Sequence, residues 1–106
     1  CPPSAGGMTI QFHPLAEREL NDAAQFYEGQ ATGLGARFLN EIDRLLQLLV
    51  AHPEIGPFKT RPVRTVRARR FPYSLVYRLV GDRLVVLAVA HHRRKPRYWT
   101  GRAPLP

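Results

Sequence analysis

The residues best suited to chemistry lie together near the end of the chain, over residues 90–99. The imidazoles of His91 and His92 titrate near neutral pH, so either ring could exchange protons with a substrate. The alternative is structural, with one ring packed at the end of a strand and the other in solvent. Adjacent residues of an extended chain point to opposite faces, so the two rings cannot hold one metal ion together. Because zinc needs about four ligands and Cys1 is the sole cysteine, we expect no metal and no cofactor.

Cations alternate with aromatic rings in the same segment. They are Arg93, Arg94, Lys95 and Arg97, followed by Tyr98 and Trp99. Cations neutralise phosphates and rings stack on bases, a combination typical of single-stranded nucleic-acid binding. A lone tryptophan near the end of a chain has a second interpretation, because its large apolar surface commonly completes a core.

Further arginines precede this cluster. Arg67 alternates with apolar residues, as on the exposed side of a strand. Arg69 and Arg70 come just before Pro72, and an irregular strand edge at this point would aim them at the same face as the cluster. Arg78 interrupts an otherwise apolar run, so it lies either at a strand end near a turn or in a polar cleft.

The sequence carries none of the common catalytic motifs. It has no glycine-rich phosphate loop, no paired carboxylates near the basic cluster, and no nucleophile with an adjacent base. An enzyme built from these residues would therefore act on RNA, with the ribose 2′-hydroxyl as the nucleophile. A histidine or tyrosine would transfer protons, and arginine or lysine would stabilise the charged phosphorane.

The first half of the chain has the apolar pattern of a strand followed by two helices. Residues 9–13 alternate between apolar and polar side chains, which predicts a short strand. Pro14 ends this strand and fits the first turn of a helix, where no amide hydrogen is needed. Apolar spacings of three and four predict helices over residues 14–29 and 33–51, with Thr32 as the cap of the second.

The second half has the pattern of strands. After a proline-rich connection over residues 53–62, alternation predicts a half-exposed strand over residues 63–70. Two β-branched, apolar runs, Tyr73–Val80 and Arg83–His91, predict central strands, and Gly81 begins a two-residue turn between them. The helices can bury their apolar faces only against this antiparallel three-strand meander. We therefore expect an α+β two-layer sandwich.

Charge is divided unevenly along the chain. Residues 1–58 carry three basic and seven acidic residues, whereas residues 59–106 carry thirteen basic residues and one acid, Asp82. Eleven of these thirteen are arginine, the better bidentate ligand for phosphate and carboxylate. This division predicts one cationic face on the outer side of the sheet, suited to nucleic acid or to an acidic protein segment.

Length and composition limit the class of protein. A chain of 106 residues fits one domain, which we place at residues 8–106, after a proline- and glycine-rich leader at residues 1–7. One cysteine allows no internal disulfide, and the apolar runs are far shorter than the roughly 20 residues of a membrane span. We therefore expect a cytoplasmic protein that does not enter the membrane.

The ordered set of features resembles the RelE/ParE superfamily of bacterial type II toxins. The resemblance spans residues 8–102 and consists of the first strand and helical hairpin, the run 69–78, the strand at 84–90 and the basic, aromatic ending at 91–99. It implies the same two-layer α+β sandwich. It also implies a cytoplasmic toxin that is neutralised by a cognate antitoxin, whose acidic or amphipathic C-terminal segment wraps the toxin in a hetero-oligomer.

The superfamily has two branches with different targets. RelE-like members cleave messenger RNA on the ribosome, and ParE-like members inhibit DNA gyrase without known catalysis. RelE-like enzymes have an arginine three residues before the tyrosine that corresponds to Tyr77, where this chain has Ser74. Loss of a cation that acts in the transition state harms an RNA-cleaving site more than a protein-binding one. The long helical hairpin also resembles the ParE branch, so we expect a ParE-like gyrase inhibitor.

Two alternatives remain open at this point: a ribosome-dependent endoribonuclease, and a nucleic-acid-binding module without toxicity. If the protein is a ribonuclease, the residues that we expect to carry catalysis are Arg78, His91, His92, Arg94 and Tyr98. The residues that we expect to bind the target or the antitoxin are Arg67, Arg69, Arg70, Arg93, Lys95, Arg97 and Trp99.

Overall fold

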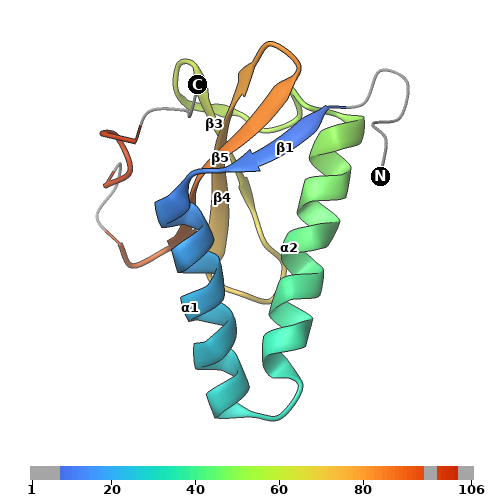
Figure 1. Ribbon diagram of the computed structural model, residues 1–106, viewed down its shortest axis with the longest axis vertical. Helices are drawn as coiled ribbons and strands as arrows, with labels where there is room; N and C mark the ends of the chain where they lie inside the picture. Colours follow the sequence, from blue (N-terminus) through green and yellow to red (C-terminus); the bar gives the residue numbers. More distant parts are fainter. Residues whose placement is uncertain (1–7, 95–97, 103–106) are drawn as a thin grey trace.

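A helical hairpin covers one face of a mixed β-sheet in the computed structural model (Figure 1). The structure describes residues 8–94 and 98–102, which form two helices and a five-stranded sheet. The elements in chain order are β1 (Thr9–Phe12), α1 (Pro14–Gln30), α2 (Leu34–Ala51), β2 (Phe58–Thr60), β3 (Val63–Arg67), β4 (Tyr73–Val80) and β5 (Arg83–His91). The expected α+β two-layer sandwich is therefore confirmed.

The sheet brings the first and the last strand of the described chain side by side. Its strand order is β1-β5-β4-β3-β2, with β1 parallel to β5 and the other neighbouring pairs antiparallel. The predicted turn between β4 and β5 is present, and Gly81 adopts the positive φ of 61° that such a turn requires. Because β1 pairs with β5, the start of α1 lies next to the strand that leads into the basic cluster.

The helices occupy almost the predicted residues, but the cap of α2 differs from the prediction. Thr32 does not cap it. The N-cap is Gly33, which has a φ of 86° and no side chain to accept a hydrogen bond. Instead, the carboxylate of Glu28 accepts hydrogen bonds from the amides of Gly33 and Gly35, at 2.9 and 3.0 Å. The first helix therefore caps the second, and the negative charge is placed where the helix dipole favours it.

The inner face of the sheet, toward the helices, carries the larger core. A Cβ at Gly35 would lie only 2.5 Å from the carbonyl oxygen of Ala24, so only glycine allows α2 to pack this closely against α1. At one end of this core, four aromatic rings contact one another. Their centroids lie between 4.9 and 6.1 Å apart, and the residues are Tyr27, Phe38, Phe71 and Tyr73.

The outer face of the sheet has a second, smaller core that contains Trp99. Its buried residues are Val63, Val76, Val85, Leu87, Ala88 and Trp99. Val76 pairs with Ala88 while Tyr77 pairs with Val86, so Leu87 is an additional residue that forms a β-bulge in β5. Trp99 is only 5% exposed, which favours its structural interpretation over base stacking.

The connection after α2 contains a strand that the sequence pattern did not predict. All three residues of β2 are exposed, so they lack the apolar alternation that identifies a strand. Tyr77 holds the loop before β2 in place. Its hydroxyl donates to the carbonyl of Pro53 at 2.9 Å and accepts from the amide of Gly56 at 3.2 Å. The guanidinium of Arg64 donates to the carbonyls of Glu54 and Gly56, both at 2.9 Å.

In the part of the chain that the structure describes, neither helix is both long enough and apolar enough to cross a bilayer.

Candidate functional site

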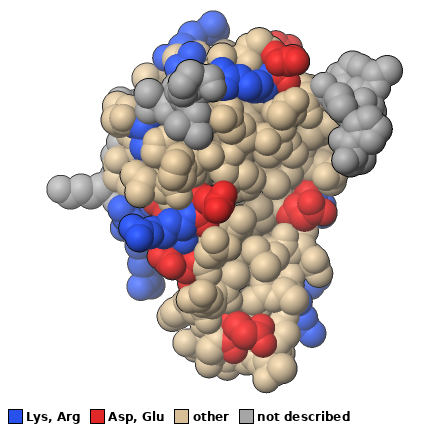
Figure 2. Space-filling view, viewed as in Figure 1, with Lys and Arg blue, Asp and Glu red and all other residues tan. Residues whose placement is uncertain are grey.

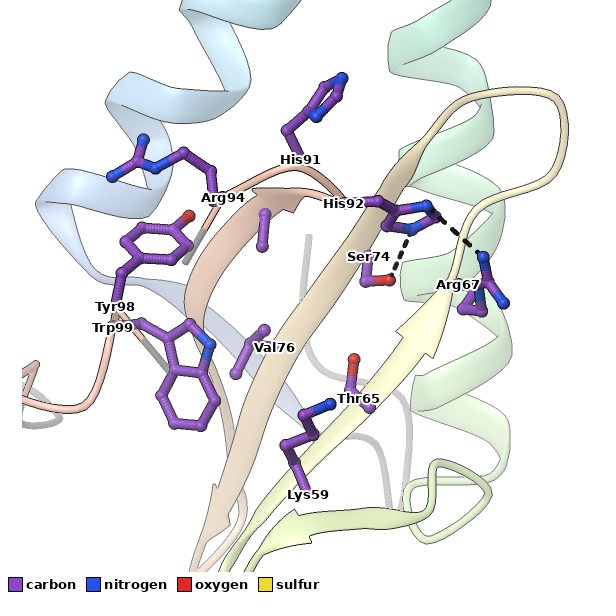
Figure 3. A pocket seen from close by; sticks show the side chains of 11 residues that line it. Lys59, Thr65, Arg67, Ser74, Val76, His91, His92, Arg94, Tyr98 and Trp99 are labelled. Carbon is purple, nitrogen blue, oxygen red and sulfur yellow. Dashed lines mark hydrogen bonds between the residues drawn. The ribbon is translucent and has the colours of Figure 1, made fainter. Parts of the chain in front are cut away.

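A pocket of about 340 Å³ lies on the outer face of the sheet, beside Trp99 (Figure 3). Strands β3 and β4, the end of β5 and the segment that follows it all contribute to its walls. The lining residues are Lys59, Thr65, Arg67, Ser74, Val76, Ala90, His91, His92, Arg94, Tyr98 and Trp99. We call this the outer pocket.

Strand alternation explains why these side chains meet. Thr65 is paired with Val76, and Arg67 with Ser74, so all four side chains point to the outer face. The edge strand β2 adds a further lining residue, Lys59 (Figure 3). Among the described lining residues there is no Asp or Glu, so the pocket is cationic and rich in hydrogen-bond donors.

His92 is held between a serine and an arginine. Its Nε2 lies 3.0 Å from the Oγ of Ser74, and its Nδ1 lies 3.5 Å from the Nη2 of Arg67 (Figure 3). Because a guanidinium can only donate, we assign the acceptor role to Nδ1 and the proton to Nε2. This tautomer donates to the Ser74 oxygen and cannot accept its proton. The pair therefore does not have the geometry of an activated serine nucleophile.

The hydroxyl of Tyr98 is bound to the carboxylate of Glu19 in α1. It donates to Oε2 of Glu19 at 2.7 Å, and the guanidinium of Arg94 lies 4.0 Å from the centre of its ring. Burial raises the pKa of Tyr98 well above its usual range, and the hydrogen bond to Glu19 raises the pKa further. The phenol therefore stays protonated at neutral pH and has its proton committed within the fold.

Glu19 holds the segment after β5 against α1. Its carboxylate accepts two hydrogen bonds from the guanidinium of Arg102, at 2.9 and 3.0 Å. It also accepts from the amide of Val89 at 3.1 Å, beyond the stretch of β5 that pairs with β1. The sequence did offer a signal for this residue, because Glu19 lies on the same helical face as the buried Ala16 and Ala23.

His91 faces a different environment from His92. Its ring meets the ring of Tyr73 edge to face at 5.0 Å, and its Nδ1 accepts from the amide of Arg93 at 3.0 Å. Burial lowers the pKa of His91, and the charge of Arg93 lowers it further. The ring is therefore neutral at pH 7, with one nitrogen already used by the backbone.

Arg78 is not part of the outer pocket. It lines a separate cleft of about 250 Å³ with Arg61 and Arg102, on the other side of Trp99. Its Nε is buried, and no hydrogen-bond partner for this atom lies within the described residues. Of the two positions predicted for Arg78, the structure shows the polar cleft.

The remaining arginines do not form one continuous face. Arg69 and Arg70 lie with α2 in a groove on the helical side, so the expectation that they face the same way as the basic cluster is wrong. Arg44 and Arg102 are paired with Glu41 and Glu19. Figure 2 shows that Lys and Arg form separate groups on the side it depicts, with Asp and Glu beside some of them.

The structure thus brings together four of the five predicted catalytic residues: His91, His92, Arg94 and Tyr98. Lys95 and Arg97 lie outside the described residues. Sequence reasoning missed Lys59 and Thr65, and treated Ser74 only as a missing arginine. No group of three or more His, Cys, Asp or Glu within residues 8–94 and 98–102 could hold a metal ion.

Comparison with known proteins places this geometry in context. Residues 10–96 match the family model described as the ParE toxin of type II toxin-antitoxin systems, parDE. No curated protein matches the sequence significantly.

Two solved structures share the fold. A chain of the chromosomal ParDE toxin-antitoxin system from P. aeruginosa is 22% identical, with a TM-score of 0.67 over 81% of this chain and 97% of that one. A doubly substituted E. coli toxin RelE in the free state is 16% identical, with a TM-score of 0.54 over 82% of this chain and 85% of that one. The two-layer architecture is therefore shared with both structures.

Proposed function

The chain belongs to the ParE family of toxins from type II toxin-antitoxin systems, and we propose that it inhibits DNA gyrase by binding it, without cleaving RNA. As a type II toxin it has a cognate antitoxin as its partner. Gyrase acts in the cytoplasm, so the proposal also assigns the toxin to that compartment.

One observation carries the choice of a binding mechanism over catalysis: the hydroxyl of Tyr98 and both ring nitrogens of His92 already have partners within the fold. Tyr98 donates to Glu19, and the ring nitrogens of His92 contact Ser74 and Arg67. RNA cleavage needs one group that removes the 2′-hydroxyl proton and another that protonates the leaving oxygen. Arg78, the expected cation for the phosphorane, lies in another cleft. What remains is a set of donors suited to docking.

We assign antitoxin binding to the outer pocket and its rim. Lys59, Arg67 and Arg94 supply positive charge, and no described lining residue is acidic. An acidic C-terminal segment of the antitoxin would complement this charge, and a toxin-antitoxin hetero-oligomer would result. Arg93, which is exposed beside the pocket, would add to the same surface.

The ribonuclease alternative has one observation in its favour, because His91, His92, Arg94 and Tyr98 all line one pocket. Two assays separate it from the gyrase proposal. Purified toxin is tested for inhibition of DNA supercoiling by gyrase, and RNA ends from a translation reaction are mapped by primer extension. We expect inhibited supercoiling and no new RNA ends, whereas ends at a fixed position within codons would overturn the proposal.

The substitution Tyr98→Phe sharpens this test. It removes only the hydroxyl that donates to Glu19, so a docking toxin should retain its gyrase inhibition within about twofold. A ribonuclease that uses this phenol should lose about 100-fold or more in rate. Expression of the unaltered chain in a bacterium without the antitoxin is the third arm. Harmless expression would favour a non-toxic nucleic-acid-binding module.

A further inference from the structure

A second cationic site lies on the helical side of the molecule, away from the outer pocket. It is a groove of about 720 Å³ between the helical hairpin and the connection from β3 to β4, which passes between the helices in Figure 1. Its lining residues are Tyr27, Leu34, Arg37, Asn40, Glu41, Arg44, Arg69, Arg70, Phe71 and Pro72. We call it the hairpin groove.

Four arginines and one carboxylate line the hairpin groove. Glu41 is fully used: it accepts from Nε and Nη2 of Arg44 at 2.8 and 2.7 Å, and from the amide of Arg69 at 2.6 Å. The guanidinium groups of Arg37 and Arg70 have no acidic partner within the described residues. The groove therefore carries positive charge that no described carboxylate balances, and Glu41 holds one of its walls in place.

The floor of the groove suits a protein segment better than a nucleic acid. The rings of Tyr27 and Phe71 meet edge to face at 4.9 Å, and Phe71 also meets Phe38 at 5.2 Å. Tyr27 and Phe71 are only partly exposed, and their rings pack edge to face against each other, which leaves less ring surface for stacking a base than a free aromatic platform would offer. Leu34 and Pro72 complete an apolar floor between the arginines.

The backbone at Arg70 is unusual. Its φ of 68° makes it the one non-glycine residue with positive φ in the described ranges. Such conformations are costly for residues with a Cβ and are concentrated at functional sites. The bond from the neighbouring Arg69 amide to Glu41 holds the connection in this form and directs the chain along the groove.

We propose that the hairpin groove binds an extended acidic segment of a partner protein, with carboxylates on Arg37 and Arg70 and one apolar side chain against Leu34 and Pro72. The charge of the rim, the apolar floor and the partial burial of its aromatic rings together favour this occupant. The proposal does not depend on which macromolecule the toxin inhibits, because the groove is separate from the outer pocket.

The test uses a synthetic peptide as the probe, Glu-Glu-Leu-Glu-Glu-Leu-Glu-Glu with blocked ends, added to the full-length, isotope-labelled toxin. We expect saturable shifts of the backbone amide signals of Asn40, Arg69 and Arg70 in NMR spectra. The double variant R37E/R70E should bind at least tenfold more weakly, which is about 1.4 kcal/mol. The matched control R18E/R61E reverses the same number of exposed charges outside both the groove and the outer pocket, and it should bind within twofold of the unaltered chain.

Three results would overturn the proposal. One is an equal loss of affinity in both double variants, which would mean general charge attraction. Another is a set of shifts confined to Ser74 and His92 in the outer pocket. The third is tighter binding of the groove to oligothymidylate of equal charge, which would make it a nucleic-acid site. If R37E/R70E does not fold, R37Q/R70G replaces it, because glycine accepts the positive φ at position 70.

Discussion

The outer pocket and the hairpin groove are both rich in arginine, but their arginines are held in different ways. In the outer pocket, Arg67 contacts His92 and Arg94 lies over the ring of Tyr98. In the hairpin groove, Glu41 fixes one arginine side chain, and Arg37 and Arg70 are left without an acidic partner in the described chain. The outer-pocket cations thus contact neighbouring rings, whereas two cations of the groove remain available to an acidic ligand.

The comparison also shows what the acidic first half of the chain does. Glu19 and Glu41 are separated from their arginine partners by very different distances in sequence, and each ties one region together. Glu19 joins α1 to the segment that bears Tyr98, and Glu41 joins α2 to the connection before β4. The acidic and basic halves of the sequence therefore do not form separate acidic and basic faces of the folded protein.

The largest expected effect comes from Trp99→Ala, which removes the wall of the outer pocket. Trp99 is buried against Val63, Val76 and Leu87, and truncation of a buried tryptophan costs about 4 kcal/mol. We expect a correspondingly lower free energy of unfolding in urea. Phe26→Ala is the control, because this ring is 58% exposed and its loss should cost far less. Equal losses would show that Trp99 does not complete a core.

Glu19→Gln should have the next largest effect, since it leaves Arg102 and Tyr98 without their charged acceptor. The side chains of Arg102 and Glu19 are only 12% and 16% exposed, so we expect a loss of about 2 kcal/mol in unfolding free energy. Glu17→Gln, on the exposed side of the same helix, is the matched control. If the two variants unfold alike, then Glu19 does not hold the C-terminal segment, and the outer pocket is less rigid than its geometry implies.

Sequence patterns predicted the elements well because most of them are long and have one buried face. The bounds of β4 and β5 were predicted to the residue, and the helices to within one residue at each end. Strand β2 was missed because its three residues are all exposed. The cap of α2 was wrongly assigned because its acceptor, Glu28, comes from the preceding helix, five residues before Gly33.

The site could be predicted only in part. Five described residues of the predicted cluster line the outer pocket, and their closeness in sequence made them easy to group: His91, His92, Arg94, Tyr98 and Trp99. The direction of Arg69 and Arg70 was not predictable, because it depends on a positive φ at a non-glycine residue that no local pattern indicates. The role of Glu19 depends on contacts with residues 70 to 83 positions away, which only the packed fold brings into reach.

A smaller effect, the salt dependence of antitoxin binding, distinguishes the outer pocket from the hairpin groove. If the antitoxin covers the outer pocket, its affinity should fall about tenfold between 0.1 and 0.5 M NaCl, because exposed ion pairs are screened. R67Q/R94Q should flatten this dependence, whereas R37Q/R70Q should leave it nearly unchanged. Binding measured by calorimetry across salt concentrations checks the difference. A flattening by the groove pair alone would place the antitoxin in the hairpin groove instead.

The smallest effect concerns the wall of the hairpin groove at low pH. The bidentate hydrogen bonds from Arg44 hold the pKa of Glu41 below its usual range, and the bond from the Arg69 amide acts in the same direction. A carboxyl whose pKa is lower in the folded state contributes stability above its unfolded pKa, and this contribution is lost as pH falls through the folded pKa.

Glu41→Gln should therefore cost about 0.5–1 kcal/mol at pH 7 and nearly nothing near pH 2. Asp43→Asn, at an exposed neighbour on α2, is the control, and urea titrations at several pH values compare the two variants. A cost for Glu41→Gln that does not change with pH would mean that packing of the side chain, and not its charge, fixes the groove.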